Sequence, residues 1–183
     1  MVKEPKRSVG LELLRQVAEN ATEILPADID ILTAQLGREP RGLVGIGARC
    51  ACGVPAVTVT YPRLPDGSPF PTLFYLSLPW AVKAVSRIES AGEMAQMNER
   101  LGCEPDLAQS YAGAHLIYVK RRNLLEEIPQ IGGKSAGGMP DRVKCLHALA
   151  AYALAAGKGI CRFGDEVLER IGWDPDRCRC ARS

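Results

Sequence analysis

The chain has 183 residues, of which 46% are hydrophobic and 24% are charged. These proportions are typical of one globular domain with short extensions, and they exclude a disordered or fibrous chain. The formal net charge of +2 gives no strong signal for binding nucleic acid or an anionic membrane through the overall field of the protein.

The N-terminal segment MVKEPKRSVGLELLRQVAEN alternates charged with aliphatic residues, so it lacks the apolar core of a signal peptide. No apolar run in the chain reaches the roughly 20 residues that a membrane span needs. We therefore expect a cytoplasmic protein without a membrane span. Helical spacing of apolar residues predicts a first helix over residues 9–24 and a second over 28–36.

Three strands are predicted next, over residues 43–48, 57–61 and 73–78. Gly53 and Pro55 supply the turn between the first two strands, which indicates an antiparallel hairpin. Four prolines lie between residues 62 and 72 and predict an ordered, extended loop, because proline restricts its own φ and its predecessor. We expect this loop to present Arg63 and to be anchored by a buried Phe70.

The remaining sequence is mainly helical, with predicted helices over residues 80–90, 93–101, 105–127, 141–156 and 165–171. Residues 131–138 form a glycine-rich segment between the helices predicted over 105–127 and 141–156. This order predicts an α+β fold, in which a small antiparallel three-stranded sheet packs against several α-helices. We expect an N-terminal helical extension over residues 1–27, a single α+β domain over 28–172 and a cysteine-bearing tail over 173–183.

Several segments resemble, in the same order, an uncharacterised bacterial family, domain of unknown function family 501. They are AQLGREPRGLVGIGARCACGVP, PRLPDGSPFPTLFYL, SRIESAG, SAGGMPDRVKCLHAL and FGDE. The resemblance runs from about residue 28 to about residue 171. Families of this kind tend to lie near septum-formation and exopolyphosphatase genes. The resemblance therefore implies a bacterial protein in a cell-division, envelope or phosphate context, and it implies no particular activity.

Seven cysteines and no secretion signal argue against a disulfide framework and leave free thiols, a catalytic thiol or a metal site. Two Cys-x-Cys pairs, one in the predicted hairpin and one in the tail, favour a metal site. Thiolates suit zinc, and four of them can also hold an iron-sulfur cluster. The predicted ligands are Cys50, Cys52, Cys145, Cys178 and Cys180, with His147 as a further donor.

A second candidate site binds an anion. Glycines ahead of a helix allow close approach to its unpaired first-turn amides, and basic side chains near them add charge. The ligand suggested by this chemistry is a phosphorylated small molecule. The predicted binding residues are Arg63, Ser135, Gly137, Gly138, Arg142 and Lys144. The alternative is that the glycines only turn the chain and that Arg142 lies at the surface.

Nucleophilic catalysis is a third possibility, with Cys145 as nucleophile, His147 or His115 as base and Asp141 or Asp165 as the orienting carboxylate. On a regular helix, however, Cys145 and His147 point about 200° apart. A helix over residues 141–156 would therefore separate the two side chains. In that case Cys145 is a small buried residue and His147 a hydrogen-bonded interfacial one.

Two functions are compatible with these patterns. The first is metal-supported binding or hydrolysis of a phosphorylated small molecule. The alternative is a non-enzymatic interaction module with a structural zinc or iron-sulfur site, linked to cell division or the envelope. A catalytic metal keeps an open coordination position, whereas a structural metal is closed by four protein ligands.

Overall fold

The computed structural model describes residues 9–180, so residues 1–8 of the predicted extension and 181–183 of the tail lie outside the described part. A three-stranded antiparallel sheet with the order β1-β2-β3 forms one layer. Its strands are β1 (Leu43–Arg49), β2 (Pro55–Thr60) and β3 (Phe74–Leu76). The predicted α+β class and three-stranded sheet are confirmed.

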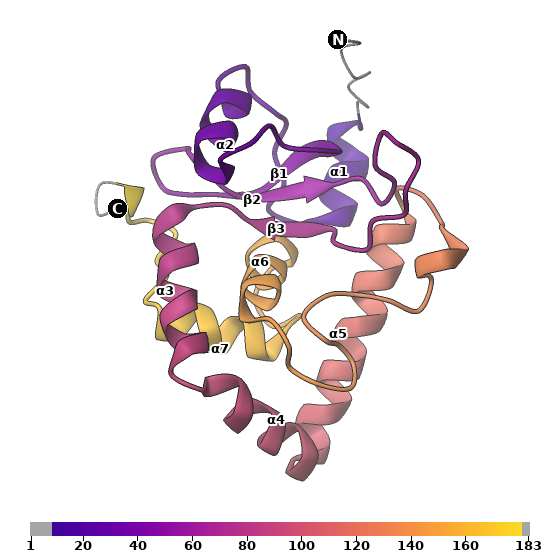
Figure 1. Cartoon of the computed structure of the whole chain (residues 1–183), viewed down its shortest axis with the longest axis vertical. Coiled ribbons are helices and arrows are strands. Elements are labelled where there is room, and N and C mark those ends of the chain that lie inside the picture. Colours follow the sequence, from indigo (N-terminus) through magenta and orange to yellow (C-terminus); the bar gives the residue numbers. More distant parts are fainter. Residues whose placement is uncertain (1–8, 181–183) are drawn as a thin grey trace.

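The helices that follow β3 form the second layer, on the face of the sheet away from α2, around one central helix, α6 (Leu146–Ala156), which lies beneath the sheet in Figure 1. α3 and α5 flank α6, and α4 joins them at the end of the molecule away from the sheet (Figure 1). The helices are α1 (Leu11–Val17), α2 (Asp28–Leu36), α3 (Pro79–Ser90), α4 (Glu93–Cys103), α5 (Pro105–Asn123), α6 (Leu146–Ala156) and α7 (Arg162–Arg170), with a 3-10 turn at Pro129–Ile131.

α6 has the sequence LHALAAYALAA and is buried from Leu149 to its last residue. Small residues let its neighbours approach closely. A Cβ added at Gly47 of β1 would lie 3.1 Å from the Ala155 Cβ, and one added at Gly164 of α7 would lie 2.3 Å from the Leu149 carbonyl oxygen. The sheet and α7 therefore pack directly on the surface of α6.

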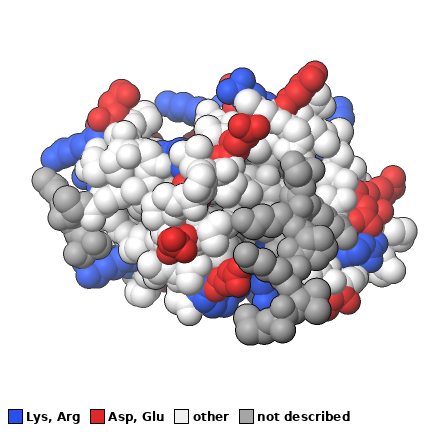
Figure 2. All heavy atoms as spheres, turned by 90° about the horizontal axis from the view of Figure 1, so that it is seen from above, with Lys and Arg blue, Asp and Glu red and all other residues white. Residues whose placement is uncertain are grey.

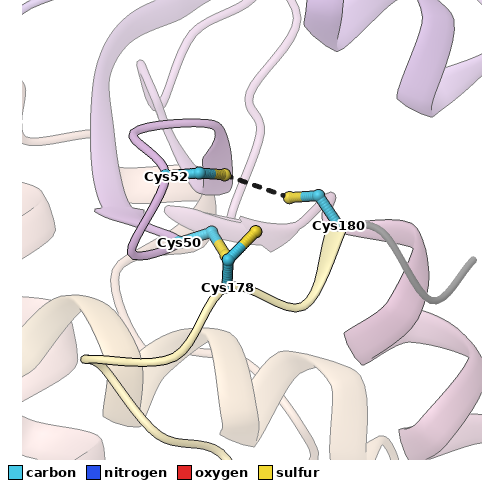
Figure 3. A group of neighbouring side chains, drawn as sticks. All are labelled: Cys50, Cys52, Cys178 and Cys180. Carbon is cyan, nitrogen blue, oxygen red and sulfur yellow. Dashed lines mark hydrogen bonds between the residues drawn. The ribbon is translucent and has the colours of Figure 1, made fainter.

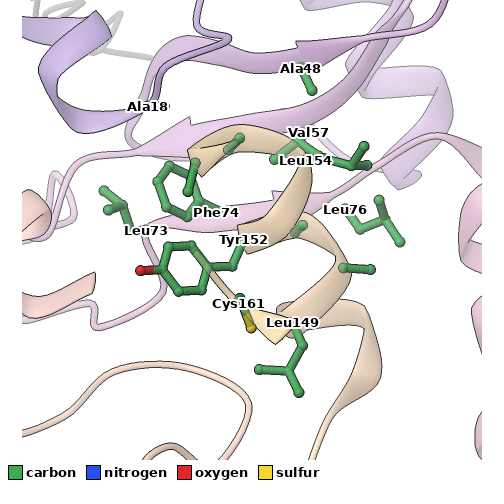
Figure 4. Close-up of a cluster of buried hydrophobic side chains, with 14 of the residues drawn as sticks. Ala18, Ala48, Val57, Leu73, Phe74, Leu76, Leu149, Tyr152, Leu154 and Cys161 are labelled. Carbon is green, nitrogen blue, oxygen red and sulfur yellow. The ribbon is translucent and has the colours of Figure 1, made fainter. Parts of the chain in front are cut away.

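Aromatic rings join β3 to the helices inside this core (Figure 4). The ring of Phe74 stacks on Tyr152 of α6 and meets Tyr118 of α5 edge-on. The Tyr118 hydroxyl accepts a hydrogen bond from the Leu73 amide. The prediction for Phe70 is wrong: it is only half-buried and lies outside the core, because the inward-facing aromatic position belongs to strand β3.

The first helix is shorter than predicted. It ends at Val17, and Thr22 instead pairs with Ile46 of β1 through two backbone hydrogen bonds of 2.8 and 3.0 Å. Leu14 and Val17 are fully buried in the main core. Residues of the predicted extension therefore contribute to the same core as the sheet.

The helix predicted over residues 141–156 also starts later, at Leu146. Tertiary hydrogen bonds replace the first helical turn. The Val143 amide donates to Asn98 Oδ1 of α4, Asn98 Nδ2 donates to the Val143 carbonyl, and the Lys144 amide donates to the Gly137 carbonyl. Cys145 thus precedes the helix, in an extended conformation with φ −149°.

Within residues 9–180, no helix is both long enough and apolar enough to cross a membrane. On the face shown in Figure 2, acidic and basic side chains are interspersed among uncharged ones.

Close packing at Gly164 makes a testable prediction. Replacing Gly164 with alanine forces a methyl group against α6 and should lower the free energy of unfolding by about 1–3 kcal/mol. Gly113→Ala is the matched control, because a Cβ at this position in α5 meets nothing within 4 Å. The control should stabilise the protein by up to about 1 kcal/mol through helix propensity. Urea denaturation measures both, and equal effects would contradict the packing described for α6.

Candidate functional site

Four cysteines from two distant segments come together beside the sheet (Figure 3). Cys50 and Cys52 lie at the turn between β1 and β2, and Cys178 and Cys180 lie in the C-terminal tail. All four sulfur atoms are within 4.8 Å of one another, and Cys52 Sγ and Cys180 Sγ are 3.4 Å apart. The cluster could therefore hold a metal ion.

Arg49 holds the turn that carries the first cysteine pair. Its guanidinium donates to both carboxylate oxygens of Asp28, at 2.9 and 2.7 Å, and to the Gly53 carbonyl. Gly53 has φ +86°, a conformation that favours glycine, and its amide closes the turn on the Cys50 carbonyl. Although burial opposes it, pairing with Arg49 lowers the pKa of the Asp28 carboxyl.

The tail is fixed to the body by contacts around the second cysteine pair. The Arg179 amide donates to Cys50 Sγ at 3.3 Å, and the Arg179 guanidinium lies over the Trp80 ring, 4.8 Å from its centroid. Trp173 packs against Trp80 from the start of the tail. Hydrogen bonds from backbone amides to thiolate sulfur are common at metal sites with cysteine ligands.

The thiols of this cluster do not share the same acidity. Burial raises the pKa of Cys50, but hydrogen bonds from the amides of Arg179 and Cys52 and from neighbouring thiols outweigh it and lower the pKa to about 7. Burial and the adjacent sulfurs of Cys52 and Cys50 raise the pKa of Cys180. A thiolate at Cys50 therefore disfavours deprotonation of Cys180, and a cation bound among the sulfurs would offset the repulsion between the two negative charges.

A separate cleft of about 1040 Å³ lies between the end of α2, strand β3, the segment 133–145 and the start of α6. Its wall includes the candidate residues Ser135, Gly137, Gly138, Asp141, Arg142, Lys144, Cys145 and His147. The structure thus gathers most of the predicted binding and catalytic residues around one concavity.

Cys145 and His147 lie side by side at this wall together with Glu89 of α3. The donor atoms of the three side chains are within 4.8 Å of one another. His147 Nδ1 is 3.1 Å from Glu89 Oε1, which also accepts a hydrogen bond from the Leu146 amide. The expected separation of Cys145 from His147 is wrong, because Cys145 precedes the helix and does not follow its 100° rotation per residue.

The two groups shift each other's proton affinity in opposite directions. A hydrogen bond with Cys145 raises the pKa of His147 to about 9, with further support from Glu89 and the Val82 carbonyl and against the effect of burial. The hydrogen bond with His147 lowers the pKa of Cys145, and the Ala148 amide acts in the same direction, whereas burial and Glu89 oppose it. This pattern favours a thiolate next to an imidazolium.

The glycine-rich segment lines the cleft next to Cys145. Gly137 and Gly138 have φ +66° and +94°, and added Cβ atoms would lie 2.5 Å from the Leu149 side chain and 2.4 Å from the Arg142 carbonyl oxygen. Their amides have no hydrogen-bond acceptor within residues 9–180. Arg142 and Lys144 are exposed, and neither forms a salt bridge within that range. The segment therefore offers donors and positive charge to a ligand.

Ser135 and His115 form a second polar pair at the cleft. His115 Nδ1 is 2.8 Å from Ser135 Oγ, and this hydroxyl can donate to the Met139 carbonyl. Burial lowers the pKa of His115, and the charge of Arg122 acts in the same direction. Arg122 itself is fully buried and donates to the carbonyls of Ile131 and Lys134, so it supports the start of the segment.

Three expectations need correction or relocation. Cys145 belongs to the group with Glu89 and His147, so it does not join the cluster of the other four predicted metal ligands, because it comes from a different edge of the core. Arg63 does not line the cleft; its guanidinium pairs with Glu126 at 2.7 Å. Asp165, expected as an orienting carboxylate for the histidine, lies in the first turn of α7 and outside the wall of the cleft, where it accepts a hydrogen bond from the Gly159 amide.

Sequence reasoning missed Glu89, the residue that orients His147. It lies 57 residues before Leu146 in the chain, and no spacing rule connects the two segments. The only sequence signal was its position within SRIESAG, one of the segments that carry the family resemblance.

The Cys145–His147 pair predicts selective thiol reactivity. Near pH 7, iodoacetamide should label Cys145 several-fold faster in the native protein than in His147→Gln, because the imidazolium favours the reactive thiolate. This advantage is present below the raised pKa of His147 and should be lost as pH rises through about 9. Peptide mass spectrometry measures the rates, and exposed Cys103 is the internal control. A rate unaffected by His147→Gln would contradict the ion pair.

Comparison with known families agrees with the earlier resemblance. The family model described as "Protein of unknown function (DUF501)" matches residues 46–169, which include Cys50, Cys52, Glu89, Cys145 and His147. Cys178 and Cys180 lie beyond the matched residues. No curated protein and no solved structure matches the chain. Because the match covers more than half of its residues, the chain belongs to the family of proteins of unknown function DUF501.

Proposed function

We propose that this protein is a zinc-supported protein that binds a phosphorylated small molecule. The zinc ion is held by Cys50, Cys52, Cys178 and Cys180, and the ligand occupies the separate cleft. The observation that carries the metal assignment is the approach of all four sulfurs to within 4.8 Å of one another.

The sulfur spacing favours one metal ion over an iron-sulfur cluster. With Zn–S bonds of about 2.3 Å, tetrahedral geometry puts the sulfurs roughly 3.8 Å apart. The thiolates of a [4Fe–4S] cluster bind different irons and therefore stand farther apart than thiolates that share one ion. Contact at 3.4 Å between Cys52 Sγ and Cys180 Sγ supports the single-ion arrangement.

Four cysteine ligands complete a tetrahedron, which supports a structural role for the zinc. None of these four cysteines is among the residues that line the cleft. The zinc would attach the tail to the turn between β1 and β2, and ligand binding would use other residues. This division differs from the expectation of a metal that shares Cys145 with the binding site.

Zinc content tests the metal assignment. Elemental analysis should find about one zinc per chain in the native protein and a loss of that zinc in Cys178→Ser and Cys52→Ser. Removing zinc that had been a thousandfold above its Kd should lower the free energy of unfolding by about 4 kcal/mol. Cys145→Ser and Cys103→Ser are matched controls and should keep the metal. Iron with sulfide, or zinc lost from Cys145→Ser, would contradict the proposal.

The cleft supports an anionic ligand through three features. Arg142 and Lys144 supply positive charge, and the amides of Gly137 and Gly138 supply donors without another acceptor in the described chain. Phosphate groups are bound in proteins by such combinations of glycine amides and basic side chains. A volume of about 1040 Å³ accommodates a small molecule.

Phosphate binding tests this half of the proposal. Calorimetry with inorganic phosphate and with small phosphate monoesters should show binding that weakens as salt is added. Arg142→Gln and Lys144→Gln should each weaken it by about ten- to a hundredfold, since a charged hydrogen bond contributes about 1.5–3 kcal/mol. Arg63→Gln removes an arginine outside the cleft and should leave affinity unchanged. Equal losses in all three variants would contradict a specific site.

A metal site that is completed by four cysteine ligands also supports a second function. A structural zinc that orders the tail is equally suited to a non-enzymatic interaction module, in which the tail and its Trp80–Trp173 contact form part of a protein-binding surface. The two functions differ in one measurable respect, because only the first requires a small molecule in the cleft.

A further inference from the structure

The binding function proposed above leaves one arrangement without a role. Ligand recognition needs positive charge and donors, yet the wall of the cleft also contains Cys145 and His147, whose donor atoms lie within 4.8 Å of each other and of the Glu89 carboxylate. Cys145 is partly exposed to the cleft, in contrast to Cys161, whose burial raises its pKa to about 12. Cys145 therefore has the exposure expected of a reactive cysteine, whereas Cys161 has the burial expected of a packing residue.

We propose that Cys145 is a catalytic nucleophile that attacks the acyl carbon of a phosphorylated small molecule, with His147 as its imidazolium partner and Glu89 as the residue that positions His147. The choice of a phosphorylated substrate rests on the proposed function of the cleft. The thiol chemistry itself rests only on the three side chains.

Hydrogen-bond partners define the state of the histidine ring. His147 Nε2 lies 3.1 Å from the Val82 carbonyl and 3.2 Å from Ser86 Oγ. The carbonyl can only accept a hydrogen bond and the Ser86 hydroxyl donates to that same carbonyl, so a proton on Nε2 suits both neighbours. Nδ1 faces the Glu89 carboxylate at 3.1 Å, and the Cys145 sulfur lies within 4.8 Å of the donor atoms of both residues. Both nitrogens therefore face acceptors, and the protonated ring stabilises a thiolate at Cys145 before substrate arrives.

Backbone donors lie near the nucleophile. A Cβ added at Gly137 would be 3.3 Å from the Cys145 carbonyl oxygen, which places the two residues in contact. The amides of Gly137 and Gly138 have no acceptor within residues 9–180, so they are candidates to stabilise negative charge on the substrate oxygen. Lys144, adjacent to the nucleophile, and Arg142 are placed to hold the phosphate group.

The reaction with an acyl phosphate balances without a further reactant besides water. The Cys145 thiolate forms a C–S bond to the carbonyl carbon, the bond from that carbon to the phosphate oxygen breaks, and inorganic phosphate leaves with the electron pair. Water then adds to the thioester carbon and the C–S bond breaks. The products are a carboxylate, phosphate and one proton released to solvent, and the thiolate is regenerated, stabilised again by His147.

Acetyl phosphate and p-nitrophenyl acetate provide a matched pair of probes, because both transfer an acetyl group and only one carries phosphate. Mass spectrometry of the intact full-length protein and its peptides should find acetylation at Cys145 with both probes. Acetyl phosphate should react with saturation, at least tenfold faster than with Cys103 in the same sample. Cys145→Ser should abolish the modification and phosphate release from acetyl phosphate.

The variants separate the chemistry from the recognition. His147→Gln and Glu89→Gln should slow acetylation by both probes, and the Glu89 variant retains an oxygen acceptor for the Leu146 amide. Arg142→Gln and Lys144→Gln should slow only the reaction with acetyl phosphate. Thermal unfolding of each variant identifies loss of structure. If p-nitrophenyl acetate modifies Cys145 but the cation variants do not affect acetyl phosphate, the proposed phosphate site fails and the thiol chemistry stands. If folded protein is not acetylated at Cys145 by either probe, this inference is overturned.

Discussion

The burial of α6 from Leu149 to its last residue is the constraint on which the rest of this structure depends. A helix covered on nearly every side needs several neighbours, and here they are the sheet, α3, α5 and α7. Alanines along α6 and glycines at positions 47 and 164 set how closely those neighbours approach. The central helix and the aromatic cluster around Tyr152 lie in one continuous apolar core with the inner side chains of the sheet.

Burial of the helix body leaves its first turn as the part of α6 that faces a cleft. The preceding residues cannot continue the helix, because Asn98 holds Val143 and Gly137 holds Lys144. The proposed reactive groups therefore lie where a rigid helix meets an irregular segment anchored by α4 and α5. Such a junction combines a positive helix end with backbone amides that regular structure does not consume.

The sequence predicted those features that depend on residues close together in the chain, such as turns and short cysteine spacings. The turn chemistry of Gly53 and Pro55 predicted the hairpin of β1 and β2, and the two Cys-x-Cys pairs indicated four of the residues that now meet. The start of α6 could not be predicted, because Val143, just before the helix, is held by hydrogen bonds to Asn98, which lies 45 residues earlier in the chain. The pairing of His147 with Glu89 is also a tertiary contact. The later start of α6 is what invalidates the helical-rotation argument against a Cys145–His147 pair, because Cys145 lies before the helix.

The cysteine cluster joins a turn near the beginning of the chain to a segment 128 residues later. During synthesis, the first pair leaves the ribosome long before the second, and domains generally begin to fold from the N-terminal side. A four-thiolate metal centre at this place can therefore form only after the sheet and the helices between the two pairs have been made. Metal uptake would then come last in maturation, and it would distinguish a chain extended to residue 180 from a shorter nascent one.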